Sequence, residues 1–128
     1  MLFRSSELIT RAPGAQLLIL DARGRDPHSV EQLKADYTLA REAEWIEFLS
    51  DCTKFQAEID REIAKKKFTL AELEEEEQSL ERLRRWHREL SLRDIFQAPS
   101  SGQAGVSLND CTESLDTFVQ LVYQELGQ

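Results

Sequence analysis

Capping and charge signals around residue 68 constrain the fold of this chain more than any other feature. Thr69 with Glu72 three residues later forms a capping box, and Phe68 with Leu73 forms a hydrophobic staple across it. Residues 65–67 are all lysines, and positive charge stabilises the C-terminal end of a helix. We therefore expect one helix to end and another to begin here, so that the two form an antiparallel hairpin.

The segments on both sides of this turn have the periodicity of amphipathic helices. Before the turn, large apolar side chains recur at steps of three or four within residues 45–63, and Pro27 is a suitable helix start. After the turn, a second stripe covers residues 73–90, and Pro99 limits that helix. Both stripes predict faces that pack against each other.

A third helix is expected near the C-terminus. Ser107 is a typical N-cap, Asp110 stands at its third position, and Gly127 can end the helix. Residues 100–105 are rich in serine and glycine and predict a flexible loop.

Residues 1–27 have a different character, with two of the three prolines of the chain. The apolar run from Leu17 to Leu20 is too short for a stable helix and predicts a buried strand, with a short helix before it. A single strand leaves half of its backbone groups without partners. It must pair with residues 1–3, with a second copy of the chain, or with a segment missing from the N-terminus.

These elements predict a mainly α chain of the α+β class. It consists of a long antiparallel helical hairpin with coiled-coil character, a third helix, a short N-terminal helix and one strand. We expect a strand-containing segment at residues 1–27, which could be the remnant of a ferredoxin-like half, and a helical domain at residues 28–128.

Composition restricts partners and location. The chain has 16 Lys and Arg against 24 Asp and Glu, a net charge of −8, so polyanions repel it and it is a poor stand-alone DNA binder. The longest uncharged apolar run, residues 15–20, is too short to span a bilayer, so no membrane association is expected. The start of the chain lacks the pattern of a signal peptide, and two cysteines cannot build a disulfide framework. A cytoplasmic location is expected.

Motifs typical of enzymes are missing from the sequence: it has no G-x-S-x-G, no P-loop and no dinucleotide fingerprint. We therefore expect no catalytic residues, no cofactor and no enzymatic activity. Cys52 and Cys111 fall on the predicted core stripes, where a free cysteine behaves as a small hydrophobe.

No metal site is predicted either. A di-iron bundle needs Glu-x-x-His pairs, but Arg84 stands three residues before His87. The acidic run at residues 74–77 points in four directions around its helix and predicts a solvated face. Glu76 and His87 nevertheless interrupt the apolar seam, so they either contact Trp, Tyr or backbone partners or are hydrated beside a third element.

The hairpin also predicts a register. With the turn centred at residues 67–68, Phe48 lies opposite His87, and Arg41 lies opposite Asp94. Arg41 and Asp94 are thus a predicted interhelical ion pair, which would specify register more than it would stabilise the fold.

One basic cluster stands out in this acidic chain, near the end of the second predicted helix. Most of it is explained by the favourable effect of positive charge at a helix C-terminus and by ion pairs within the helix. The remaining hypothesis is a site for an anion or a nucleic-acid phosphate. Its candidate residues are Arg84, Arg85, Arg88 and Arg93.

Several motifs in order resemble the N-terminal domain of ChrB-type chromate-resistance proteins, over roughly residues 15–126. They are Arg41-Glu-Ala-Glu-Trp-Ile-Glu-Phe48, Lys67-Phe-Thr-Leu-Ala-Glu-Leu-Glu-Glu75, Leu83-Arg-Arg-Trp86, Arg93-Asp-Ile-Phe96, and Cys111 with Phe118, Val122 and Tyr123. The resemblance implies a transcriptional regulator of chromate efflux whose domain begins with ferredoxin-like strands. We expect this chain to lack the first of those strands.

Two functions are therefore expected. The first is a non-catalytic accessory or regulatory domain of chromate resistance, for which DNA is a partner only by resemblance. The alternative is a structural interaction module that forms a homodimer, or completes a partner protein's sheet, through the strand at Leu17 to Leu20.

Overall fold

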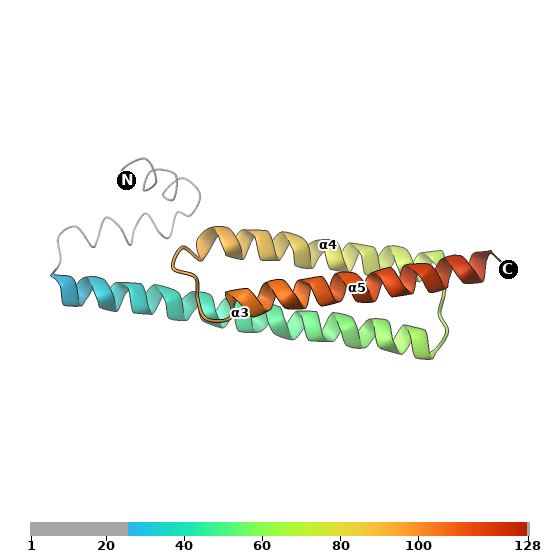
Figure 1. The fold of residues 1–128 in the computed structure, drawn as a ribbon, viewed down its shortest axis with the longest axis horizontal. Coiled ribbons are helices and arrows are strands. Elements are labelled where there is room, and N and C mark those ends of the chain that lie inside the picture. Colours follow the sequence, from blue (N-terminus) through green and yellow to red (C-terminus); the bar gives the residue numbers. More distant parts are fainter. Residues whose placement is uncertain (1–25, 128) are drawn as a thin grey trace. The chain divides into compact units, whose positions relative to one another are not determined.

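The computed structural model describes residues 26–127. Three helices make up most of this range: α3 (Pro27–Ala64), α4 (Leu70–Arg93) and α5 (Ser101–Leu126) (Figure 1). The mainly α prediction is confirmed. Residues 26–127 contain no strand, so the α+β part is not seen, and the predicted strand at Leu17 to Leu20 and its preceding helix lie outside the described residues.

The chain divides into two compact units. Unit 1 consists of Met1–Ile46 with Arg88–Ser101, of which residues 26–46 and 88–101 are described. Unit 2 consists of Glu47–His87 with Gly102–Gln128. Unit 1 thus contains the first half of α3 and the end of α4, while unit 2 contains the rest of both helices and nearly all of α5. The predicted division at residue 27 remains a prediction.

The predicted turn between the two long helices is confirmed. Helix α3 ends at Ala64 and α4 begins at Leu70. The backbone N–H of Glu72 donates to Thr69 Oγ1 at 3.2 Å, which is the capping bond that the sequence predicts.

The C-terminal end of α3 is closed by a Schellman motif. The Lys67 N–H donates to the carbonyl of Glu62 at 2.9 Å, and the Lys66 N–H donates to that of Ile63 at 3.1 Å. Lys66 has a φ of 57°, in the left-handed region. A side chain with a Cβ is strained there, whereas glycine is not.

We expect Lys66→Gly to raise the free energy of unfolding by about 0.5–1 kcal/mol, because glycine removes this strain at the C′ position. Urea denaturation measures the change. Lys65→Gly is the matched control, since the Lys65 backbone does not have a positive φ and glycine there only adds entropy to the unfolded chain. Equal effects of the two substitutions would contradict the strain argument.

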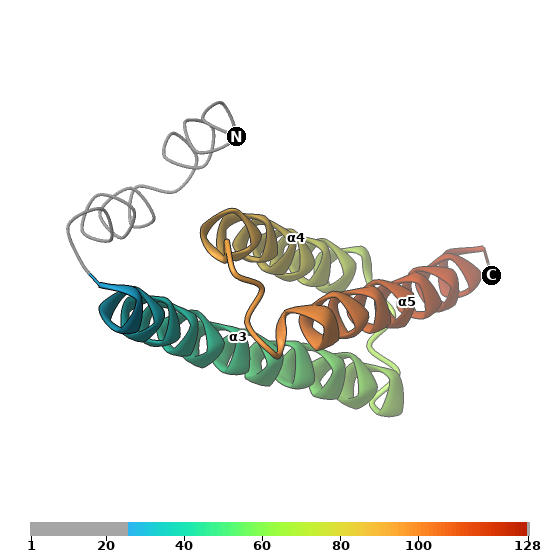
Figure 2. The same cartoon turned by 60° about the vertical axis from the view of Figure 1, so that its left-hand side comes forward.

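In unit 2, α5 lies beside the second half of α3 and the first part of α4 in both ribbon views (Figures 1 and 2). Phe68 and Phe118 approach with ring centroids 6.1 Å apart. The α3 stripe supplies four buried side chains of this core: Phe48, Cys52, Phe55 and Ile59. Both cysteines of the chain are free and buried, and Cys111 Sγ donates to the Cys52 carbonyl at 3.5 Å, so their predicted core positions are confirmed.

The predicted register is confirmed at one position. Phe48 contacts His87 with ring centroids 5.6 Å apart, and Trp86 meets Phe48 edge to face at 5.4 Å. His87 is half-buried, and this burial lowers its pKa. The seam histidine is therefore packed against an aromatic ring.

The predicted start of the third helix is wrong. Helix α5 begins at Ser101, so Gly102 and Gly105 belong to the helix and not to a loop. A distant residue supports the N-terminal end of α5. The backbone N–H of Ser100 donates to the carboxylate of Glu42 at 2.8 Å, and the hydroxyl of Ser100 donates to the same carboxylate. Ala104 is fully buried, which explains why the extra turns form.

The predicted Arg41–Asp94 ion pair is also wrong. Arg41 Nε pairs with Glu44 Oε1 at 2.5 Å on its own helix. Asp94 Oδ2 instead accepts from Trp45 Nε1 at 2.7 Å, and both Asp94 oxygens accept from the Ala98 N–H at 2.9 Å. The residue opposite Asp94 is one helical turn further along α3 than the predicted register places it.

Candidate functional site

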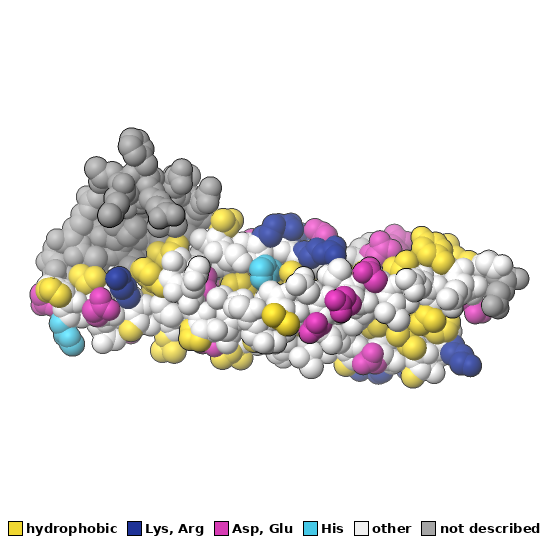
Figure 3. Space-filling view, viewed as in Figure 1, with side chains coloured by type: hydrophobic (Ala, Val, Ile, Leu, Met, Phe, Trp, Pro, Cys, Tyr) yellow, Lys and Arg dark blue, Asp and Glu magenta, His cyan; other side chains and the backbone are white. Residues whose placement is uncertain are grey.

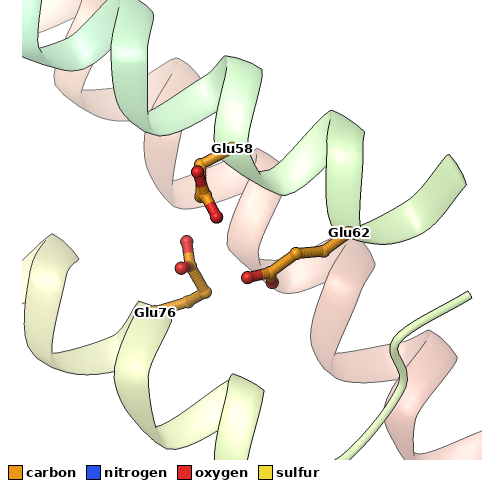
Figure 4. Close-up of side chains that lie close together, drawn as sticks. All are labelled: Glu58, Glu62 and Glu76. Atoms are coloured by element: carbon orange, nitrogen blue, oxygen red, sulfur yellow. The ribbon is translucent and has the colours of Figure 1, made fainter. Parts of the chain in front are cut away.

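Three carboxylates converge within unit 2. Glu58 and Glu62 stand four residues apart on α3, which places them on one face of the helix, and Glu76 reaches them from α4. One oxygen from each carboxylate lies within 4.8 Å of the others. Figure 4 shows the three side chains pointing toward one another. We call these three residues the carboxylate cluster.

Burial makes this cluster unusual. Glu62 and Glu76 are only 5% and 4% exposed, because each stands on an otherwise apolar stripe beside residues such as Ile59 and Leu80. Oε2 of each has no hydrogen-bond partner among the described residues. Glu58 is half-buried, and its Oε2 pairs with Arg61 Nη2. Two acidic side chains are therefore incompletely satisfied in a position where proteins rarely leave charge.

The electrostatics follow from this placement. Burial raises the pKa of Glu62 to about 8, and a hydrogen bond with Glu72 and repulsion by Glu76 act in the same direction. Burial also raises the pKa of Glu76 to about 7, together with repulsion by Glu58. Near neutral pH the cluster therefore favours a bound proton more than an exposed glutamate does.

A groove of about 420 Å³ opens beside the cluster between α3 and α4 of unit 2. Glu58 and Glu76 form part of its wall, so the cluster adjoins this groove. Lys54 and Arg82 contribute basic groups, and Trp86 contributes an aromatic surface. Chemically, this arrangement can hold a proton or a small cation at its acidic end.

Sequence reasoning missed this cluster. The expectation of a solvated face is confirmed for Glu74, Glu75 and Glu77, which are exposed, but it is wrong for Glu76. The available signal was the position of Glu76 on the apolar stripe of α4. The prediction of no metal site was based on the lack of Glu-x-x-His pairs and on the divergence of the acidic side chains at residues 74–77, and it did not anticipate that Glu58 and Glu62 would meet Glu76.

The candidate arginines are divided between the two units. In unit 2, Arg84 lies 3.9 Å from Glu81 and donates to Thr112 Oγ1 at 3.4 Å, while Arg85 is exposed. In unit 1, Arg88 is exposed and Arg93 pairs with Glu44 at 2.6 Å. Basic side chains gather on the middle of α4 in Figure 3. A site made from all four arginines therefore remains a hypothesis.

Residues 26–127 define an α-helical protein with a buried carboxylate cluster and a basic stretch on α4. None of the helices in this range is both long enough and apolar enough to cross a membrane. The chain belongs to the family described as Protein ChrB, N-terminal, whose model matches residues 1–128, and it is thus related to chromate resistance. No curated protein and no solved structure matches the chain significantly.

Proposed function

We propose that the chain is a non-catalytic regulatory domain of chromate resistance that acts in the cytoplasm and binds an anionic partner through α4. The observation that carries this proposal is the family match over residues 1–128. The alternative, a dimerising interaction module, depends on the strand at Leu17 to Leu20, which lies outside the described residues.

Arg84 and Arg85 are the strongest candidates for the binding contact. Both belong to α4 of unit 2, where Arg85 is exposed and Arg84 makes only long contacts to Glu81 and Thr112. Such weak surface ion pairs contribute about 0–1 kcal/mol, so a phosphate or an oxyanion can replace them. Arg93 is less available because of its close pair with Glu44.

We expect Arg84→Ala/Arg85→Ala to weaken binding to double-stranded DNA by about tenfold and to reduce the salt dependence of that binding, because two phosphate contacts are lost. Fluorescence anisotropy over a range of salt concentrations measures both quantities. A parallel titration with chromate tests the anion itself. The acidic chain makes low ionic strength the appropriate starting condition.

The matched control is Lys65→Ala/Lys67→Ala, which removes the same charge from exposed positions in the same unit. This control should retain binding close to that of the wild type. Equal losses in the two double variants would indicate non-specific attraction, and flat titrations with both probes at low salt would remove the proposal.

A further inference from the structure

We propose that Glu58, Glu62 and Glu76 bind one divalent cation that prefers oxygen ligands, with Mg²⁺ and Mn²⁺ as the best candidates. This site is independent of the proposed regulatory function, because none of its residues is among the candidate arginines. It would make a bound metal part of the structure of unit 2.

The geometry suits such an ion. In an octahedral site with metal–oxygen distances near 2.1 Å, ligand oxygens lie about 3 Å apart at adjacent positions and about 4.2 Å apart at opposite ones. The three carboxylate oxygens already lie within 4.8 Å of one another without an ion. Each glutamate side chain has several rotatable bonds through which its carboxylate can move closer to the other two.

The second observation is the unsatisfied chemistry of the two buried members. Oε2 of Glu62 and Oε2 of Glu76 lack hydrogen-bond partners within residues 26–127, and both side chains are at least 95% buried. A buried carboxylate normally has a cationic or hydrogen-bonding partner, because leaving it alone is strongly unfavourable. Figure 4 shows both carboxylates aimed into the space that an ion would fill.

Nearby basic side chains do not fill this role. Arg61 pairs with Glu58, at the least buried member of the cluster. Lys54 and Arg82 line the groove that Glu58 and Glu76 also line, but they do not satisfy the two unpartnered oxygens. An ion at the cluster would face three carboxylates, which together exceed its charge of +2.

The groove also provides a route and additional ligands. Glu58 and Glu76 face its volume of about 420 Å³, so a hydrated ion can approach from solvent and keep several of its waters. Mg²⁺ typically binds proteins in this way, through a few carboxylates with water completing the octahedron. Histidine and cysteine do not belong to the cluster, which favours hard cations over zinc or copper.

Titration of the full chain with MnCl₂ tests the proposal, by calorimetry and by the loss of the electron paramagnetic resonance signal of free Mn²⁺. We expect one ion per wild-type chain. Glu62→Gln and Glu76→Gln should each weaken binding at least tenfold, because each removes a charged ligand. Glu77→Gln is the matched control, since it removes the same charge from an exposed neighbour on α4 and should leave the affinity unchanged.

Circular dichroism distinguishes lost binding from lost folding. The two cluster variants should retain wild-type helicity, and Mn²⁺ should raise the melting temperature of the wild type and of Glu77→Gln but not of the cluster variants. Absence of binding at millimolar Mn²⁺ would overturn the proposal and leave a cluster that holds protons only. Equal weakening in Glu77→Gln would also overturn it, because binding would then be diffuse. DNA binding through Arg84 and Arg85 is measured separately, so either proposal can fail alone.

Discussion

An Asp94→Ala variant is expected to have a free energy of unfolding about 3–5 kcal/mol below that of the wild type. Asp94 is 7% exposed and accepts hydrogen bonds from the Trp45 indole and from the Ala98 backbone. Alanine removes the acceptor for both donors within unit 1. Both donors belong to buried residues, so an unmade hydrogen bond there is unfavourable.

Urea denaturation at neutral pH measures this loss, and two further variants locate its origin. Asp94→Asn retains one acceptor oxygen, so we expect a smaller loss of about 1–2 kcal/mol. In a Trp45→Phe background the indole donor is already gone, so Asp94→Ala should destabilise the chain less than in the wild type. An Asp94→Ala variant within 1 kcal/mol of the wild type would contradict the proposed role of this carboxylate.

The turn between α3 and α4 could be predicted because its signals are local. The capping bond from Glu72 to Thr69 involves residues three positions apart, and the lysines at residues 65–67 act on the helix that they end. Helix termini of this kind need no knowledge of the distant fold. The amphipathic stripe of α3 was predictable for the same reason, since periodicity along one helix determines which side is buried.

The start of α5 could not be predicted, because the residue that completes its cap is distant in the sequence. Ser100 donates to Glu42, which lies 58 positions earlier on α3. Local capping rules favour Ser107, and the two glycines before it argue against helix. The tertiary contact and the burial of Ala104 outweigh these preferences.

The predicted register at the open end of the hairpin was wrong for a related reason. The position of the turn determines which residues of α3 and α4 face each other only to within about one helical turn. Phe48 lies opposite His87 as predicted, but Asp94 faces Trp45 and not Arg41. An indole N–H satisfies a buried carboxylate without burying a second charge, whereas Arg41 remains near the surface with Glu44.

The carboxylate cluster could not be predicted from the pattern of either helix alone. The sequence placed Glu76 on a buried stripe, but only the interhelical register brings Glu58 and Glu62 of α3 to it. An isolated acid on an apolar stripe is weak evidence for a site. Three acids that converge from two helices, two of them unsatisfied, are stronger evidence, and this convergence follows from the fold and not from any local motif.

The cluster also predicts a stability that depends on pH. Burial raises the pKa of Glu62 from its ordinary value of 4.5 to about 8. A chelator in the experiment keeps metal ions away from the cluster, so that only this proton is measured. The folded state therefore binds this proton more tightly than the unfolded state, so its contribution to stability is complete below pH 4.5 and is lost as the pH rises toward 8. Glu62→Gln replaces the protonated acid with a neutral group of similar shape and removes this dependence.

We therefore expect wild type and Glu62→Gln to have similar free energies of unfolding at pH 4.5, and Glu62→Gln to become the more stable protein by on the order of 3 kcal/mol at pH 9. Chemical denaturation of both proteins across this range measures the difference, in which titrations of groups that do not interact with Glu62 cancel. Glu77→Gln, at an exposed position, should follow the wild-type curve. A constant difference between wild type and Glu62→Gln at every pH would mean that Glu62 ionises equally easily in the folded and unfolded chains. Such a result would be incompatible with a carboxylate that is 5% exposed and lacks a partner for one of its oxygens.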